Sequence, residues 1–344
     1  MTATLTKDFS YLVEKQKAPA FSFFFRVHSG SEKQLHDKGH MRSKCHEVIK
    51  DAGLQSALTE NLLKKVDQEI EQLDLSTGAK SFGIFISPEF AATKLYYTYL
   101  PERQYKGEYF SALESLYAEQ QSRRYVMFHL EGRAIQVFKG QNDHLEILES
   151  SPELELVNKI YKHKDTTQAD KDGKAHRGEH DIKWIKEFLD AMSALCSKLE
   201  SPAVIVGNSL TAATEEDFKK SSLNVIACID EVVHATGGNS LTELGTKITE
   251  LIQENISKEW LAKCNEAASG HKLVTSNDEM IACVVEGRAA QLLLETPAWD
   301  NSGLLEFTPL HEIARETLAK HGSLEFLSKD TLKKWNGQVM LLRY

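Results

Sequence analysis

The stretch RYVMFHLEGRAIQVFKG, residues 124–140, decides the fold class because it predicts a pair of β-strands joined by a tight turn. Both halves are rich in β-branched and aromatic residues, and Glu131-Gly132 lies between them. Gly132 supplies the backbone freedom that such a turn needs. An antiparallel hairpin is therefore expected near the middle of the chain, and its neighbours decide what kind of sheet it joins.

The segments after the hairpin predict a mixed sheet with helices on its faces. Residues 181–199 place apolar side chains at helical spacing, and SPAVIVGN (201–208) is a short apolar run typical of a buried strand. A helix at 214–220 and a strand at 223–233 complete the order β–β–α–β–α–β. Gly207-Asn208 is predicted as a structural turn, since it matches no nucleotide-binding fingerprint.

The residues before the hairpin predict an α/β domain over 1–120. Three β-rich runs occur in it: FSFFFRV (21–27), SFGIFIS (81–87) and KLYYTYL (94–100). One long helical stretch, from about residue 35 to 75, separates the first run from the other two.

The residues after the middle block predict an α–β–α sandwich. A long helix starts near Leu241, AAQLLLET (289–296) predicts a strand, and a helix and two further β-rich runs follow. The chain is therefore expected to be an α/β protein of three α/β domains, with boundaries at 1–120, 121–245 and 246–344.

Composition favours a globular protein in a reducing compartment. Of the 344 residues, 41% are apolar and 26% are charged, and the net charge of −9 gives no general attraction to nucleic acid. The five cysteines are scattered without a CxxC pair, which disfavours a zinc ribbon and a disulfide framework and favours buried thiols. No secretory signal or membrane-length apolar run is evident, so a cytoplasmic protein without membrane contact is expected.

The segment KHKDTTQADKDGKAHRGEHDIKW (162–184) departs from its surroundings because it has almost no apolar residue. Its part from 162 to 180 predicts a flexible loop that can meet RNA locally, with five Lys or Arg, four Asp or Glu and three His. A metal site is the alternative, because His176 and His180 are four residues apart. The solvated loop is favoured because no glutamate lies between the two histidines and because Gly178, which does, weakens a helix there.

Two further groups of basic residues are candidate phosphate contacts. Arg123 and Arg124 lie at the start of the first strand of the hairpin. The second group lies in the first helical stretch, where such residues more often only solvate a helix face; it consists of Lys33, Lys38, Arg42, Lys44 and Lys50. Histidines of the same region show no metal-ligand spacing and are predicted as surface residues: His28, His36, His40 and His46.

The order of several motifs resembles the bacterial relatives of the archaeo-eukaryotic class I release factors and Pelota, a group that includes ribosome hibernation factors. The resemblance covers nearly the whole chain as a pattern, and it implies a ribonuclease H-like middle domain, a C-terminal domain similar to kink-turn-binding ribosomal proteins and an N-terminal domain of its own type. The motifs are PAFSFFFRVHSG, FGIFIS, VMFHLEGRAIQVFKG, AVIVGN, HATGGNS, IACVVEGRAAQLLLE and the terminal LLRY.

One departure from this family concerns its catalytic loop. Release factors carry a Gly-Gly-Gln tip between the hairpin and the long helix of the middle domain, and residues 162–180 at this position contain none. Gly173 and Gly178 are not adjacent, and Gly237-Gly238-Asn239 and Asn336-Gly337-Gln338 lie elsewhere in the pattern. The sequence thus predicts no catalytic residue, resident metal or cofactor, and an enzyme is the less favoured interpretation.

The resemblance implies a non-catalytic translation factor that binds the ribosomal A site in hibernation, stalling or rescue. An elongation GTPase is a second expected partner, and DNA is not expected to be one. Two alternatives stay open: a hydrolase acting on peptidyl-tRNA or RNA through the loop, and an acidic adaptor that binds another protein. The predicted RNA-binding residues are Lys162, Lys164, Lys171, Lys174, His176, Arg177, His180, Arg123 and Arg124.

Overall fold

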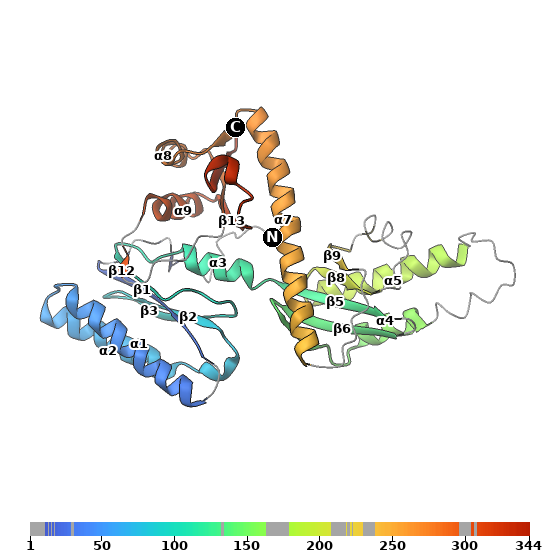
Figure 1. Ribbon diagram of the computed structural model, residues 1–344, viewed down its shortest axis with the longest axis horizontal. Helices are drawn as coiled ribbons and strands as arrows, with labels where there is room; N and C mark the ends of the chain where they lie inside the picture. Colours follow the sequence, from blue (N-terminus) through green and yellow to red (C-terminus); the bar gives the residue numbers. More distant parts are fainter. Residues whose placement is uncertain are drawn as a thin grey trace. The chain divides into compact units, whose positions relative to one another are not determined.

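A computed structural model gives the architecture of the chain (Figure 1). Its described residues are 11–12, 14, 16, 18–28, 31–131, 134–162, 179–207, 218, 221, 223–229, 238–295, 304–305 and 308–344. They contain three sheets with helices packed against them, which confirms the predicted α/β class. Among these residues, no helix is long and apolar enough to cross a lipid bilayer.

The N-terminal sheet is covered on one face by a pair of helices, which lie side by side in Figure 1. Phe21, Phe23 and Phe25 point towards these helices, whereas Phe24 belongs to a core on the opposite face, as the alternation of a strand requires. The strand order is β12-β4-β1-β2-β3. The elements are β1 (Ala20–Arg26), α1 (Ser31–Asp51), α2 (Ser56–Gln72), a 3₁₀ turn (Leu75–Thr77), β2 (Ser81–Ile86), β3 (Ala91–Tyr96), β4 (Arg103–Gly107) and β12 (Leu304–Leu305).

Two predicted elements of this region have different bounds in the structure. The single helix expected from about residue 35 to 75 is divided into α1 and α2, because the chain turns at Gly53, whose φ of +68° favours glycine. The strand expected at 94–100 is shifted to 91–96. Strand β4 was not predicted, because RQYKG contains one aromatic residue and little apolar alternation.

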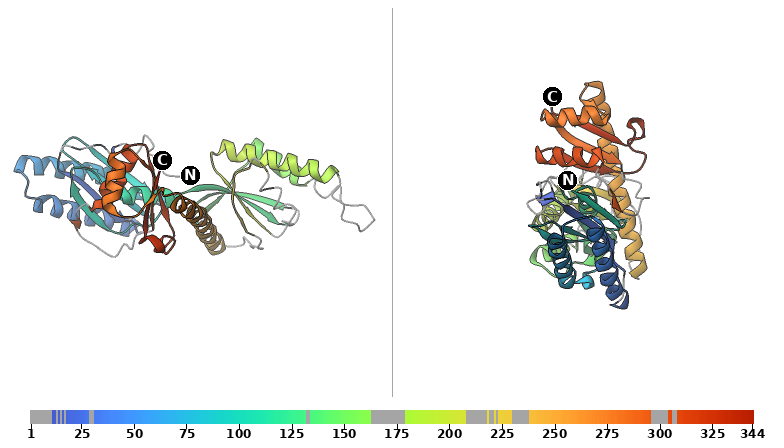
Figure 2. Two further views of the ribbon diagram at one scale, coloured as in Figure 1. Left: turned by 90° about the horizontal axis from the view of Figure 1, so that it is seen from above. Right: turned by 90° about the vertical axis from the view of Figure 1, so that its left-hand side faces the viewer.

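The middle sheet is mixed, as predicted, with the order β7-β6-β5-β8-β9. Strands β5, β6 and β7 pair antiparallel, whereas β8 and β9 run parallel to β5. Two helices cover one face of this sheet, as the view in Figure 2 shows for the longer one. The elements are β5 (Arg124–Glu131), β6 (Ala134–Gln141), β7 (His144–Ile147), α4 (Pro152–Lys162), α5 (Glu179–Lys198), β8 (Ala203–Val206) and β9 (Val225–Ile229).

The hairpin and the long helix of the middle block are confirmed, and α4 and β7 are additions. Val126, Phe128 and Leu130 of β5 pack against α4 and α5 in one apolar core. The turn at Gly132 and most of the helix expected at 214–220 lie outside the described residues.

The C-terminal sheet forms the predicted α–β–α sandwich, with the order β10-β14-β11-β13. Helices α8 and α9 contribute to the core on one face, and the end of α7, through Cys264, contributes to the core on the other. The elements are α7 (Gly238–Ser269), β10 (Leu273–Val274), α8 (Asn277–Val285), β11 (Ala289–Glu295), α9 (Pro309–Ala319), β13 (Ser323–Leu327), a 3₁₀ turn (Lys333–Trp335) and β14 (Gln338–Leu342).

The chain divides into two compact units. The first unit consists of residues 1–122 and 256–344, and the second of residues 123–255. The predicted boundaries of three domains stay a prediction, because the first and third of them share one compact unit here.

Two features join the distant segments of the first unit. Gln120 lies in the last turn of helix α3 (Leu113–Gln121). Its Nε2 donates to Leu324 O at 2.6 Å, and its Oε1 accepts from Phe326 N at 2.8 Å. One side-chain amide therefore satisfies both backbone groups at the edge of β13. In addition, β12 pairs parallel with β4 and so extends the N-terminal sheet.

A buried carboxylate lies near this junction. Glu114 has no exposed surface and accepts hydrogen bonds from Tyr105 Oη at 2.5 Å and Ser111 Oγ at 2.6 Å. The Arg103 guanidinium lies 3.7 Å from it and balances its charge. The ring of His311, from α9, packs against Tyr105 with 5.1 Å between ring centroids.

The environment of His311 predicts an acid sensitivity of the first unit. Desolvation lowers the pKa of His311 below its ordinary value of 6.5, with Glu114 opposing this effect and Arg103 adding to it. The unfolded chain therefore binds the proton more tightly, so stability is lost as the pH falls below 6.5. We expect urea unfolding between pH 7.5 and 5.0 to show this loss, and His311→Gln to reduce it.

Glutamine is the matched replacement because the Nδ1 of His311 accepts from Thr308 N at 3.2 Å and closes a capping box, a role that glutamine also serves. Equal pH slopes for the wild type and His311→Gln would contradict the assignment.

Candidate functional site

The predicted loop is only partly described. Lys162, predicted as its first residue, is instead the exposed last residue of α4. His180 lies in the first turn of α5. Five predicted contacts lie outside the described residues and stay a prediction: Lys164, Lys171, Lys174, His176 and Arg177.

Arg123 and Arg124 lie near the opposite end of α5 from His180. Arg124 is the exposed first residue of β5, and Arg123 is half-buried before it. Val126 N donates to Pro202 O at 2.8 Å, so the start of β5 adjoins the chain that leaves the end of α5. His180 is at the other end of this helix, roughly 27 Å away at 1.5 Å per residue. Among the described residues, His180 and the Arg123-Arg124 pair therefore do not share one patch.

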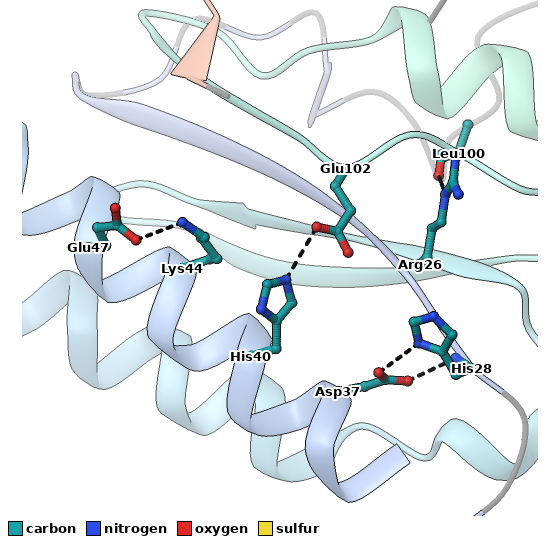
Figure 3. Close-up of polar contacts among 8 residues, drawn as sticks. All are labelled: Arg26, His28, Asp37, His40, Lys44, Glu47, Leu100 and Glu102. Carbon is teal, nitrogen blue, oxygen red and sulfur yellow. Dashed lines mark hydrogen bonds and ion pairs between the residues drawn. The ribbon is translucent and has the colours of Figure 1, made fainter. Parts of the chain in front are cut away.

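A different cluster of polar residues lies where β1 of the first unit ends (Figure 3). Asp37 of α1 is 5% exposed and accepts two hydrogen bonds from His28, one from the backbone N at 2.8 Å and one from Nδ1 at 2.9 Å. These contacts orient the imidazole and assign the Nδ1 proton to the Asp37 bond. The His28 side chain is 60% exposed, and within the described residues its Nε2 has no protein partner.

A second imidazole, that of His40, lies on α1 about one turn after Asp37. His40 Nε2 lies 3.2 Å from Glu102 Oε2, and Figure 3 shows the two side chains facing one another. Arg26, the last residue of β1, donates from Nε to Leu100 O at 3.2 Å. Two carboxylate-bound imidazoles and a guanidinium bound to a backbone carbonyl thus lie at one end of the N-terminal sheet.

Two of the basic residues of α1, Lys38 and Arg42, contact α2. Arg42 Nε lies 2.9 Å from Asp67, which also accepts from His46 at 3.0 Å. Lys38 donates to Glu71 O at 3.4 Å. These pairs hold one helix against the other, and as partly exposed ion pairs each contributes about 0–1 kcal/mol. The prediction that the histidines are plain surface residues is incomplete, because His28, His40 and His46 each bind a carboxylate.

The site has no ready nucleophile or metal centre in the part of the chain that the structure describes. No group of three His, Cys, Asp or Glu side chains is placed there to hold a metal ion. Cys45, Cys196, Cys264 and Cys283 are buried, whereas Cys228 is partly exposed. Burial raises the pKa of Cys196 to about 12, so this thiol stays protonated near neutral pH.

Comparison with known proteins gives structural likenesses only. No family model and no curated protein matches the chain. Ribosome-bound archaeal Pelota, solved with ABCE1, is 14% identical over 77% of this chain and 72% of that one, with a TM-score of 0.42. Dom34 of S. cerevisiae is 12% identical over 77% and 74%, with a TM-score of 0.40. The archaeal termination factor aRF1 is 12% identical over 97% and 95%, with a TM-score of 0.26.

The solved structures that resemble this chain include Pelota, Dom34 and an archaeal translation termination factor. Their sequences share few residues with this chain. The assignment of its fold therefore rests on its own strand order and pairing.

Proposed function

We propose that the protein is a non-catalytic, release-factor-like translation factor that binds the ribosomal A site in hibernation, stalling or rescue. The observation that carries the proposal is the position of the polar segment in the order of elements of the second unit. It connects α4 to α5 in a unit whose strands run in the order β7-β6-β5-β8-β9. The motif order of the sequence makes this connection the equivalent of the release loop.

The chemistry of this segment supports binding rather than hydrolysis. Peptide release needs backbone groups at the tip of an adjacent glycine pair, and residues 162–180 lack one. They keep five cationic side chains, which suit a phosphate backbone. The names of the similar structures describe Pelota as ribosome-bound and Dom34 as interacting with Hbs1. For this chain, the ribosome and an elongation GTPase are the proposed partners.

Sedimentation tests the proposal. When a lysate of stationary-phase cells that contain the protein is separated on a sucrose gradient, we expect the protein in the ribosomal fractions. A protein that stays wholly in the free fraction would contradict ribosome binding. An electron-microscopy map of the sedimenting complex would then show whether the A site is occupied.

The loop makes a separate prediction about affinity. Changing Lys171, Lys174 and Arg177 together to glutamate should weaken ribosome binding by about tenfold or more. The variant makes fewer phosphate contacts, so its binding releases fewer counterions from the RNA. Sedimentation at several salt concentrations measures the effect, and the salt dependence should become shallower. The matched control changes three exposed lysines elsewhere, Lys64, Lys258 and Lys329, to glutamate. Equal weakening by both triple variants would point to overall charge instead.

A further inference from the structure

Helices α4 and α5 are bonded to one another at both ends of the pair that they form. At one end, Lys198 Nζ in the last turn of α5 lies 2.7 Å from Glu153 Oε2 in the first turn of α4. At the other end, Trp184 Nε1 donates to Ile160 O at 2.7 Å. The two helices therefore run antiparallel, and the end of α4 is fixed beside the beginning of α5. Residues 163–178, which carry most of the predicted phosphate contacts, connect these two ends along the chain.

The bond from Trp184 lies where α4 requires a donor from outside the helix. The carbonyls of the last four residues of a helix have no N–H partner within it. Ile160 is one of these four, because α4 ends at Lys162. The indole N–H satisfies this carbonyl from 24 residues further along the chain. A side chain of α5 thus stabilises the last turn of α4.

Three aromatic side chains hold the same place, and we call Tyr161, Trp184 and Phe188 the aromatic clasp. The Trp184 ring stacks on that of Phe188, one turn later on α5, with 5.3 Å between ring centroids and 10° between ring planes. Tyr161 of α4 contacts both rings, with its centroid 6.4 Å from Trp184 and 5.4 Å from Phe188. Tyr161 is 3% and Phe188 2% exposed. The clasp therefore joins the two helix ends by packing as well as by the hydrogen bond.

Fixed helix ends lower the entropic cost of a contact that the connecting segment makes with RNA. If these ends fray, the residues of the last turn of α4 and the first turn of α5 must be ordered again when the RNA binds, and this ordering opposes binding. The clasp removes this cost before binding occurs. It leaves the number of cations that can meet a phosphate unchanged, so it affects the affinity and not the count of phosphate contacts.

Core packing at the other end of α5 provides the comparison. Leu195 is 1% exposed and belongs to the same apolar core as Tyr161 and Phe188. It is eleven residues after Trp184 on the same helix, roughly 16 Å away at 1.5 Å per residue. Loss of this side chain weakens the core of the second unit and leaves the aromatic clasp in place.

We propose that Trp184 is a positioning residue for the ribosome contact of the second unit. Through the aromatic clasp it fixes the ends of α4 and α5 between which the cationic segment lies in the chain. The inference rests on the proposed function and deepens it, because it names the residue through which the two helices control the affinity of this segment for RNA phosphate. Trp184 acts through its neighbours and needs no contact with the RNA.

Binding of the full chain to ribosomes purified from cells that contain the protein tests the assignment, with salt varied between about 50 and 200 mM. Trp184→Leu removes the ring and the donor, so its Kd should rise about three- to tenfold at each salt concentration, with an unchanged salt slope. Trp184→Phe keeps a ring beside Phe188 but lacks the N–H, and its Kd should rise about two- to threefold. Leu195→Ala should bind as the wild type does under conditions in which it is folded.

Equal rises in Kd for Trp184→Leu and Leu195→Ala would show a general loss of core packing and overturn the inference. A Trp184→Leu variant that folds and binds as the wild type does, or one whose salt slope is shallower, would overturn it too. Thermal unfolding establishes which variants are folded. If Trp184→Leu does not fold, Trp184→Phe decides, and an unchanged Kd contradicts the role of the indole N–H. Failure of the proposed function is distinguishable, because the wild type itself would then bind no ribosomes.

Discussion

Replacing Glu114 by alanine is expected to lower the free energy of unfolding of the first unit by about 3–5 kcal/mol, the range for breaking a buried ion pair. The side chain has no exposed surface and accepts hydrogen bonds from Tyr105 and Ser111. Its removal leaves both hydroxyl groups without this acceptor and breaks the ion pair with Arg103, whose side chain is 12% exposed. Denaturant unfolding followed by hydrogen exchange measures the loss and assigns it to residues 1–122 and 256–344.

Glu119→Ala is the control for this prediction because the residue lies on the same helix. Its side chain is 54% exposed and pairs with Lys94 at 3.6 Å. A partly exposed pair of this kind contributes about 0–1 kcal/mol, so the variant should unfold almost as the wild type does. Similar costs for Glu114→Ala and Glu119→Ala would show that the buried network contributes little.

Replacing Gly207 by alanine is expected to destabilise the second unit by roughly 3–5 kcal/mol, at the high end of single substitutions. A Cβ at this position would lie 2.0 Å from Leu130 O and 2.8 Å from the Leu130 carbonyl carbon, both backbone atoms. The backbone φ of +141° adds strain for any residue with a side chain. Gly207 N also donates to Ile229 O at 3.0 Å, so the strand end cannot move without breaking the sheet.

Gly287→Ala separates the two contributions to the Gly207 effect. Gly287 has a φ of +72°, but an added Cβ would meet no atom within 4 Å. Its replacement should cost about 1 kcal/mol from backbone strain alone. Hydrogen exchange in β5, β8 and β9 should accelerate in Gly207→Ala and stay unchanged in Gly287→Ala. Unchanged protection of these strands in Gly207→Ala would contradict the close approach.

The sequence predicts the sheets and the long helices because their signals are local. Alternating or continuous apolar residues mark β5, β6 and β8, and helical spacing marks α5. Gly207 was predicted as part of a structural turn, and in the structure its Cα lies too close to the Leu130 backbone to carry a side chain. Helix α4 escaped prediction because the residues between the hairpin and the polar segment were assigned to no element, although Leu154, Val157 and Tyr161 form its buried face.

The candidate site could not be predicted in the same way, because its pairs are distant along the chain. His40 meets Glu102, 62 residues later, and Arg26 meets the backbone of Leu100, 74 residues later. No local sequence pattern connects these positions. The four histidines of this region lack metal-ligand spacing, so the sequence did not indicate that three of them bind carboxylates. An available clue was KLYYTYL, whose three tyrosines exceed what one buried strand face can hold. Tyr96 is buried, whereas Tyr97 and Tyr99 are exposed.

The discontinuity of the first unit has a consequence for the order in which the protein matures during synthesis. Residues 1–122 are synthesised before the 133 residues of the second unit (123 to 255). Strand β12, which pairs with β4, and strand β13, which binds Gln120, are synthesised later still. At roughly 5–20 residues per second, the nascent N-terminal sheet waits about 7–27 s while the second unit is translated. During this time the edge of β4 and the Gln120 amide lack their final neighbours, and a chaperone that covers them would favour correct assembly.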